Sequence, residues 1–294
     1  VASATRGATA ISRSGGVTTH VLRQVMMRIP LFVLDSTASA IKFRHWIEDH
    51  FEELKAQTRL VSRHAQLKSV VPDQVGTRVN ITFAYETGDA AGQNMTTSCT
   101  WKACQWILDQ MQHFPEILVE SFIVDGNMSG DKKVNYQAFI NGRGTRVTAE
   151  ALITNEILER ILKVSARQLE EGHLQSMSAG VNIGMIGNNC NIANTIGAMF
   201  TALGQDIACV HESSLGTLRF QAANEGLYAT LDLPALIVGS VGGGTNLPTQ
   251  ADYLEMIDCK GVHKAGRLAE IIAGFCLSLD LSTSPNLSPS SSPP

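Results

Sequence analysis

The sequence predicts an α+β fold, in which a small β-α-β-β-α-β domain is inserted into a larger domain of mixed helices and strands. Apolar and polar residues alternate over residues 78–86, which is the period of a half-buried strand. Apolar residues then recur at helical spacing between Met95 and Met111. Four further segments complete the order β-α-β-β-α-β within residues 29–124.

The small domain, residues 29–124, is expected to have the split βαβ, or ferredoxin-like, arrangement. Asp35 or Ser36 can cap its first helix, because a short polar side chain there accepts backbone N–H bonds. The expected elements are a strand at 29–34, a helix through Leu54, strands at 65–71 and 78–86, a helix that ends at Phe114-Pro115, and a strand at 117–124.

The large domain is expected to combine residues 1–28 and 125–281. Residues 282–294 are almost entirely Ser, Thr and Pro, so we expect a disordered tail that cannot bury apolar surface. The expected elements of the large domain are a helix over 1–28 interrupted at Gly15-Gly16, a strand pair around 134–151, a helix over 155–171, a helix that ends at Leu203, a hairpin at 217–239, and two helices after Gly244.

Composition excludes several classes of function. A net charge of -4 gives no basis for nucleic-acid binding, and no stretch of apolar residues is long enough to predict a membrane span. The six cysteines form no CxxC pair, which predicts reduced and mostly buried thiols. The eight histidines form no ligand-like pattern, so we predict no metal site.

The turn Thr87–Asn94 joins the clearest strand to the clearest helix. A turn of small residues there leaves backbone N–H groups free at the positive end of the helix dipole, which is a natural place for a phosphate. The turn is not GxGxxG, so it does not indicate a Rossmann domain.

Three other clusters could carry chemistry, and each has a plainer explanation. In residues 125–133 a lysine beside an aspartate could stabilise an oxyanion, or the segment could be a solvated loop. Asp206 lies among apolar residues and so must be paired, or it is an ordinary loop acid after a capping Gly204. The glycines of 241–245 could admit a ligand or another chain, or could pack a helix on a strand.

Taken in order, these blocks resemble the catalytic portion of 3-hydroxy-3-methylglutaryl-CoA reductase of the eukaryotic, NADPH-using type. The resemblance covers residues 1–281. It rests on Val1-Ala2-Ser3, Arg6-Gly7, Gly88–Asn94, Gly126-Asn127 with Asp131-Lys132-Lys133, Asn194, Gly204-Gln205-Asp206, and Val241–Asn246 with Gln250.

The resemblance implies that the small domain binds NADPH and the large domain binds a CoA thioester. An arginine near the adenosine 2′-phosphate favours NADPH over NADH by its charge. The residues implied to contact the cofactor are Ser62, Arg63, Asp89, Gly92, Gln93 and Asn94. The family usually has Met where this chain has Ala91 and Gln93.

For the reaction, the resemblance implies that Lys132 stabilises or protonates the oxyanion that each hydride transfer creates. Asp206 would pair with this lysine, and Asn194 would orient the substrate and the lysine. The implied substrate contacts are Arg28, Asn127, Asp131 and Lys133 to the hydroxymethylglutaryl group and Ser3 and Arg6 on the CoA side.

Several positions depart from the family pattern. Asp125 stands where the family often has Ser, and Thr9 stands where it has another arginine. The resemblance also implies a glutamate before Val1 and a histidine past the last helix, so the chain is expected to be truncated at both ends. His20 and His211 are conceivable substitutes for that histidine.

Two alternatives therefore stay open beside a fragment of an active reductase. One is a diverged paralogue that reduces another acyl-CoA or an aldehyde. The other is a non-catalytic protein that binds nucleotide or pairs with an intact subunit. The resemblance further implies a homodimer or homotetramer, and an intact protein anchored to the endoplasmic reticulum membrane with its catalytic part facing the cytosol.

Overall fold

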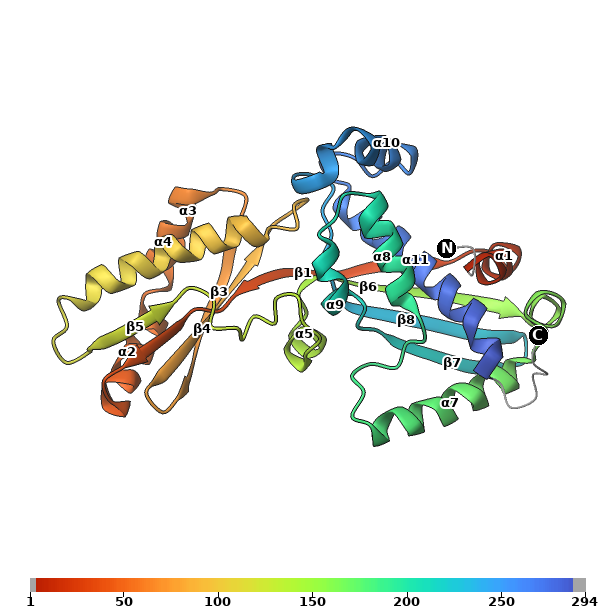
Figure 1. The fold of residues 1–294 in the computed structure, drawn as a ribbon, viewed down its shortest axis with the longest axis horizontal. Coiled ribbons are helices and arrows are strands. Elements are labelled where there is room, and N and C mark those ends of the chain that lie inside the picture. The colour runs from red at the N-terminus through yellow and green to blue at the C-terminus, as the bar shows by residue number, and fades with distance from the viewer. Residues whose placement is uncertain (1–3, 288–294) are drawn as a thin grey trace. The chain divides into compact units, whose positions relative to one another are not determined.

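The computed structural model describes residues 4–287 and has the expected α+β composition (Figure 1). The chain divides into two compact units. The small unit is Gln24–Asp131, which contains the expected small domain and extends a few residues beyond it at each end. The large unit consists of the described residues on either side of this segment.

The small unit is built on antiparallel strands in the order β5-β2-β4-β3, with the last residues of β1 also paired with β4. The chain order of these strands and the intervening helices is strand, helices, two strands, helix, strand. The elements are β1 (Thr18–Arg28), β2 (Leu31–Leu34), α2 (Thr37–Asp49), α3 (Phe51–Val61), β3 (Gln66–Val75), β4 (Arg78–Glu86), α4 (Gln93–Met111) and β5 (Val119–Ile123).

Local sequence rules account for this unit well. Ser36 caps α2, and its side chain accepts a bond from the backbone N–H of Ser39 at 3.1 Å. Strand β4 covers the residues predicted from alternation, and its buried side chains include Ile81 and Phe83. These pack in one core with Phe43 of α2 and other apolar residues of α3 and α4.

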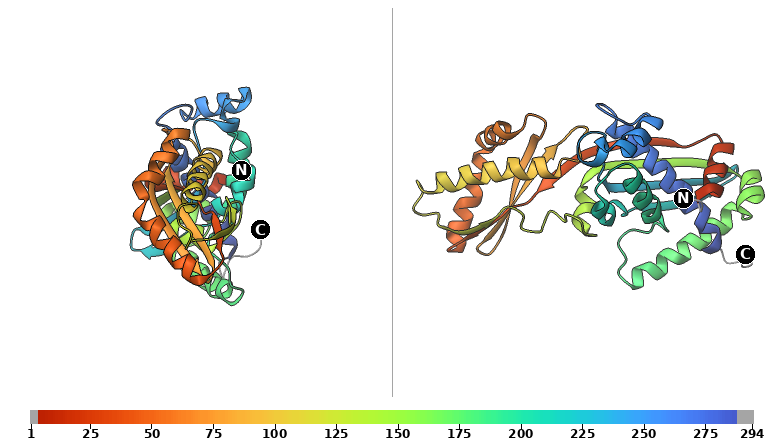
Figure 2. Two further views of the ribbon diagram at one scale, coloured as in Figure 1. Left: turned by 90° about the vertical axis from the view of Figure 1, so that its left-hand side faces the viewer. Right: turned by 45° about the horizontal axis from the view of Figure 1, so that its top comes forward.

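The large unit contains a second antiparallel sheet in which β6, β8 and β7 follow one another, with β1 beside β6. The long helix α11 lies across β6 and β8 and also contacts α1 and α8 (Figures 1 and 2). The elements are α1 (Thr5–Arg13), α5 (Tyr136–Asn141), β6 (Gly144–Thr154), α6 (Asn155–Ile157), α7 (Ala166–Asn182), α8 (Ile192–Ala202), α9 (Val210–Ser213), β7 (Thr217–Ala223), β8 (Gly226–Leu236), α10 (Pro248–Met256) and α11 (Ala265–Thr283).

The N-terminal prediction was wrong after residue 13. Helix α1 ends there, Gly15 and Gly16 adopt positive φ of 109° and 103°, and residues 18–28 form β1 instead of continuing the helix. Pairing with strands that are distant in the sequence stabilises β1, and no local pattern reports such pairing.

Two other predicted elements differ in type or extent. Only β6 forms from the predicted strand pair at 134–151, because Asn135 caps a short helix at Tyr136 by accepting the N–H of Ala138 at 2.7 Å. The predicted helix at 155–171 breaks at Lys163, whose φ is +62°. A new helix starts after Ser165, where a complete capping box is present.

The prediction of a disordered tail from residue 282 was wrong for its first six residues. Helix α11 continues to Thr283, and residues 284–287 form a 3₁₀ turn. Ser282 and Ser284 are buried, and the Ser284 hydroxyl donates to the carbonyl of Asp280 at 2.7 Å. Packing thus overrides a composition that is typical of disorder, and residues 288–294 lie outside the described part of the chain.

The structure bears on two of the predictions made from composition, the state of the cysteines and the lack of a membrane span. The six cysteines, all within the described residues, form no disulfide with one another, and five of them are buried. Among residues 4–287, no helix combines the length and apolar character needed to cross a bilayer.

Candidate active site

The turn between β4 and α4 is held by short contacts within the small unit. The Thr87 hydroxyl donates to the carbonyl of Ala90 at 2.8 Å. Gly88 and Gly92 have φ of +61° and +82°, and a Cβ at Gly92 would lie 2.4 Å from the Thr87 side chain. The first turn of α4 contains no acidic residue. The turn therefore leaves a positive helix N-terminus that an anionic group can approach.

The end of α3 lies beside this turn. The Ser62 hydroxyl donates to the sulfur of Met95 in the first turn of α4 at 3.1 Å, and Arg63 next to it is exposed. The end of α3 and the start of α4 thus meet through Ser62 and Met95, which are 33 residues apart in the sequence. The remaining residues predicted to contact the cofactor lie in the turn and are half-buried or exposed: Asp89, Gly92, Gln93 and Asn94.

A second group of candidate residues in the small unit surrounds Arg28, at the end of β1. Arg28 is buried, with 5% of its surface exposed. Its Nη1 forms a short ion pair with Asp125 and lies 3.6 Å from Oδ2 of Asp131. Its Nη2 donates to the carbonyl of Gln93 at 3.4 Å, which connects this cluster to the first turn of α4. The buried Nε has no hydrogen-bond partner among the described residues.

Asp125 also organises the loop that follows it. Its carboxylate accepts the backbone N–H of Asn127 at 3.0 Å and the hydroxyl of Ser129 at 3.1 Å. Gly126 donates its N–H to the carbonyl of Ile29 at 2.8 Å, so the loop is fastened to the strand segment next to Arg28. Asp125 is thus paired and half-buried, and the first part of this segment is not merely a solvated loop.

In the large unit, Lys132 and Asp206 form an ion pair with 3.2 Å between Nζ and Oδ2. Their side chains are 39% and 44% exposed. A pair so accessible to water contributes little to stability, typically about 0–1 kcal/mol. Asp206 also accepts the N–H of Ala208 at 3.1 Å, which fixes the carboxylate on the first turn of the helical segment after it.

A buried pair holds the backbone of Lys132. Lys132 has φ of +57°, and its N–H donates to Oε1 of Glu212 at 3.0 Å. Glu212 in turn pairs with Arg143 at 3.4 Å, and both side chains are 0% exposed. Sequence reasoning missed Arg143 and Glu212, because neither belongs to a chemical motif and only the fold brings residues so far apart together.

Close packing explains one of the glycines of 241–245, Gly244, whereas a Cβ at Gly242 or Gly243 would meet open space. Gly204 has φ of +67°, and a Cβ on it would lie 2.3 Å from the carbonyl oxygen of Gly244. The Gln205 side chain both donates to and accepts from the backbone of Gly239, at 3.0 and 2.8 Å. Close backbone packing therefore requires glycine at 204 and 244, and it fixes the segment that carries Asp206.

Asn194 lies exposed in the first turn of α8. Its side-chain amide donates to Oδ1 of Asn191 at 2.8 Å. The backbone N–H groups of Cys190 and Asn191 donate to the buried carboxylate of Asp280 at 3.0 and 2.7 Å. Burial raises the pKa of Asp280 to about 6, and the two donated N–H bonds oppose part of that shift.

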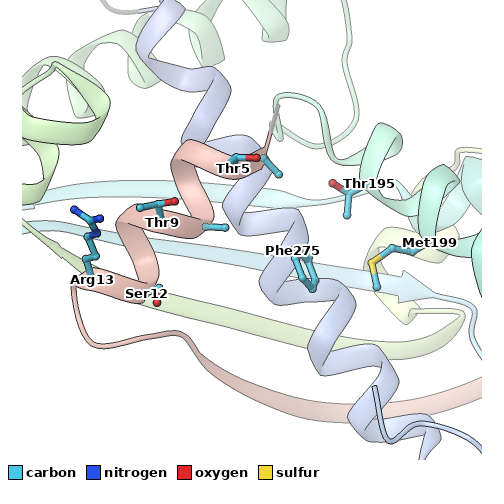
Figure 3. A pocket seen from close by; sticks show the side chains of 9 residues that line it. Thr5, Thr9, Ser12, Arg13, Thr195, Met199 and Phe275 are labelled. Atoms are coloured by element: carbon cyan, nitrogen blue, oxygen red, sulfur yellow. The ribbon is translucent and has the colours of Figure 1, made fainter. Parts of the chain in front are cut away.

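A cavity of about 570 Å³ opens between α1, α8 and α11 of the large unit (Figure 3). Its wall combines small hydroxyls with apolar surface, and Thr195, the residue after Asn194, belongs to it. The lining residues are Ala4, Thr5, Ala8, Thr9, Ser12, Arg13, Thr195, Met199 and Phe275.

Other predicted residues lie elsewhere or outside the description. Arg6 donates to the carbonyl of Ser282 at 2.8 Å and is not among the residues that line the cavity. Lys133 is exposed, as are His20 on β1 and His211 on α9. Ser3 lies outside the described residues.

The hydroxymethylglutaryl-coenzyme A reductase family model matches residues 1–290 of this chain. The chain belongs to the hydroxymethylglutaryl-coenzyme A reductase family. It is 37% identical to the 3-hydroxy-3-methylglutaryl-coenzyme A reductase of Methanocaldococcus jannaschii, over 96% of this chain and 70% of that protein. The enzyme of the same name from Schistosoma mansoni is 36% identical over 96% of this chain and 30% of its own length.

The fold agrees with this family. The class II reductase of Streptococcus pneumoniae, solved bound to NADPH in open conformations, superposes with a TM-score of 0.73 at 19% identity. That match covers 97% of this chain and 77% of the other. At this identity the match supports the fold alone.

The relatives correct the expectation of a eukaryotic type of reductase. Most of the similar reductases are archaeal, so the eukaryotic type was only partly right. Archaeal cells have no endoplasmic reticulum, and these relatives therefore argue against the predicted association with that membrane.

Proposed function

We propose that this chain is the catalytic part of an NADPH-dependent reductase that converts 3-hydroxy-3-methylglutaryl-CoA to mevalonate and free CoA. The observation that carries the proposal is the accessible Lys132–Asp206 ion pair, whose lysine backbone is fixed by the buried carboxylate of Glu212. Two NADPH and two protons are consumed for each thioester reduced to an alcohol, and two NADP⁺ and one CoA are released.

Lys132 has the electrostatic role in this proposal. NADPH, when bound, supplies the two hydrides. Each hydride that adds to a carbonyl carbon places negative charge on the oxygen, and a nearby ammonium group stabilises that charge and can donate a proton. The carboxylate of Asp206, 3.2 Å from the lysine nitrogen, holds the ammonium group in position through a charge-assisted contact.

The turn at the start of α4 suits the diphosphate of NADPH. Gly88 has open space where a Cβ would be, and the helix N-terminus behind the turn carries no acidic residue in its first turn. The exposed Arg63 offers a cation to the 2′-phosphate. We therefore assign cofactor binding to residues 29–124, whose strand order supports a ferredoxin-like domain, and thioester binding to the large domain of 1–28 and 125–281.

For the acyl group we propose Arg28, Asn127, Asp131 and Lys133 as contacts, with Asn194 orienting the thioester and Ser3 and Arg6 on the CoA side. Arg28 supports this role because its buried guanidinium is anchored by the backbone of Gln93, and its Nε has no hydrogen-bond partner within residues 4–287. The cavity beside Thr195 accommodates the pantetheine arm in this proposal. We also propose a homodimer or homotetramer as the working form.

The proposal is tested by following NADPH oxidation with 3-hydroxy-3-methylglutaryl-CoA and the purified full chain. Lys132→Gln should lower kcat by a factor on the order of 10²–10³, because the charge that stabilises the oxyanion is lost. Lys163→Gln is the matched control, since Lys163 is also exposed and also has a positive φ. Absence of thioester-dependent NADPH oxidation in the unmodified chain, or a Lys132 variant as active as its control, contradicts the proposal.

A second candidate is reduction of an aldehyde such as mevaldehyde. An aldehyde needs one hydride and one proton, and no thiolate has to leave. NADPH oxidation with mevaldehyde but not with the thioester would select this candidate.

A further inference from the structure

One face of α1 forms a wall of the cavity between α1, α8 and α11. Thr5, Thr9 and Arg13 follow one another at intervals of four residues and so lie along the same face of the helix. Across the cavity stand Thr195 and Met199, with Phe275 between the two sides (Figure 3). From Thr5 to Arg13 the wall is about 12 Å long, at 1.5 Å per helical residue.

Among the described residues that line this cavity, Arg13 is the one charged side chain, and none is a carboxylate. Within residues 4–287 it forms no ion pair or hydrogen bond, and it is exposed. Arg6, by contrast, donates to the carbonyl of Ser282. An unpaired guanidinium at one end of a cavity of apolar and hydroxyl groups favours a ligand that has an uncharged arm and an anionic end.

We propose that Arg13 binds a phosphate group of the coenzyme A moiety. Its guanidinium supplies the positive charge that the hydroxyl of Thr9, one helical turn earlier, cannot supply. This inference rests on the proposed function, in which the substrate is a CoA thioester. The pantetheine arm has apolar methylenes for Phe275 and Met199 and amides for the hydroxyls of Thr9 and Thr195. Guanidinium groups recognise phosphate oxygens through paired, charge-assisted hydrogen bonds.

Arg13 could instead act only on the stability of helix α1, and the test must distinguish this role from phosphate binding. It lies in the last turn of α1, where a cation interacts favourably with the helix dipole. That effect acts on the helix whether or not the ligand carries a phosphate. Ligands with and without phosphate groups therefore distinguish the two roles.

The test is titration calorimetry of the full chain with coenzyme A, dephospho-coenzyme A and pantetheine. Arg13→Ala should weaken coenzyme A binding by about tenfold to a hundredfold and leave pantetheine within about twofold, because only the former offers phosphate. Adding Thr9→Arg to Arg13→Ala should restore most of the affinity, since it returns a cation to the same helix face one turn earlier. Arg167→Ala removes an exposed arginine of α7 as the matched control.

Dephospho-coenzyme A identifies the phosphate concerned. If dephospho-coenzyme A binds the unmodified chain and the Arg13 variant with equal affinity, Arg13 contacts the 3′-phosphate. If dephospho-coenzyme A binds the variant more weakly than the unmodified chain, Arg13 contacts the diphosphate. Equal losses for coenzyme A and pantetheine, an unchanged coenzyme A affinity, or no coenzyme A binding by the unmodified chain overturns the inference. Failure of the proposed function alone would appear as Arg13-dependent coenzyme A binding without NADPH oxidation. Arg13→Gln serves if the alanine variant does not fold.

Discussion

Asp280 should make the stability of the large unit depend on pH in a way that a single substitution removes. Its carboxylate is fully buried and accepts the N–H groups of Cys190 and Asn191. Burial raises its pKa from 3.8 to about 6. A shift of about two units corresponds to about 3 kcal/mol, at about 1.36 kcal/mol per unit.

The sign follows from which state binds the proton more tightly. Because the folded-state pKa lies above the unfolded value, the stabilising contribution of protonated Asp280 is fully present below about pH 4. It is lost as the pH rises through about 6, and about half of the 3 kcal/mol falls between about pH 5 and pH 8. Asp280→Asn cannot titrate, so it should lack this dependence.

The assay is urea unfolding followed by circular dichroism at several pH values in that range. The free energy of unfolding of the unmodified chain, minus that of Asp280→Asn, should fall by about 1–2 kcal/mol from the acidic to the alkaline end. Asp252→Asn, at an exposed site on α10, controls for loss of one negative charge. Parallel pH profiles for the unmodified chain and Asp280→Asn would refute the reasoning.

Three further predictions concern the candidate site. Asp125→Asn keeps an acceptor for the loop but removes the charge beside Arg28, so the KM for 3-hydroxy-3-methylglutaryl-CoA should fall about tenfold. The KM for a CoA thioester whose acyl group lacks the terminal carboxylate should show no such change. Glu212→Ala should lower the free energy of unfolding by about 3–5 kcal/mol, because it breaks the fully buried ion pair with Arg143 by removing one partner, and urea unfolding within about 1 kcal/mol of the unmodified chain would contradict this. Gly92→Ala should weaken NADPH binding in a fluorescence titration without global unfolding, since a Cβ at φ of +82° clashes across the turn; unchanged affinity would show that the turn is not part of the cofactor site.

Where neighbours along the chain decide the structure, the sequence predicted it well. Strand β4 follows from alternation alone, because its apolar face is fully buried and its other face is mostly half-buried or exposed. Ser36 was recognisable as a cap, since an N-cap needs only its own side chain and an N–H three residues later. The hairpin of β7 and β8 has the same local character.

The elements that failed depend on distant partners. Residues 18–28 become a strand only because other strands lie beside them, and Ser282 stays in a helix because the end of α11 is buried against other elements. The position of Lys132 depends on Glu212, which is eighty residues away in the sequence. Periodicity and capping rules carry no information about contacts of that range.

The sequence by itself determined the α+β class, the small-residue turn at the start of α4 and, through the spacing of its motifs, the hydroxymethylglutaryl-coenzyme A reductase family. Only the tertiary structure decided that Asp125 pairs with Arg28 and that Arg143 and Glu212 support Lys132. It also placed Arg13 at a cavity where no residue of the described range 4–287 pairs with its side chain. The physical reason is that hydrophobic periodicity and turn chemistry act over a few residues, whereas the burial and pairing of a charge depend on which distant segments the fold places around it.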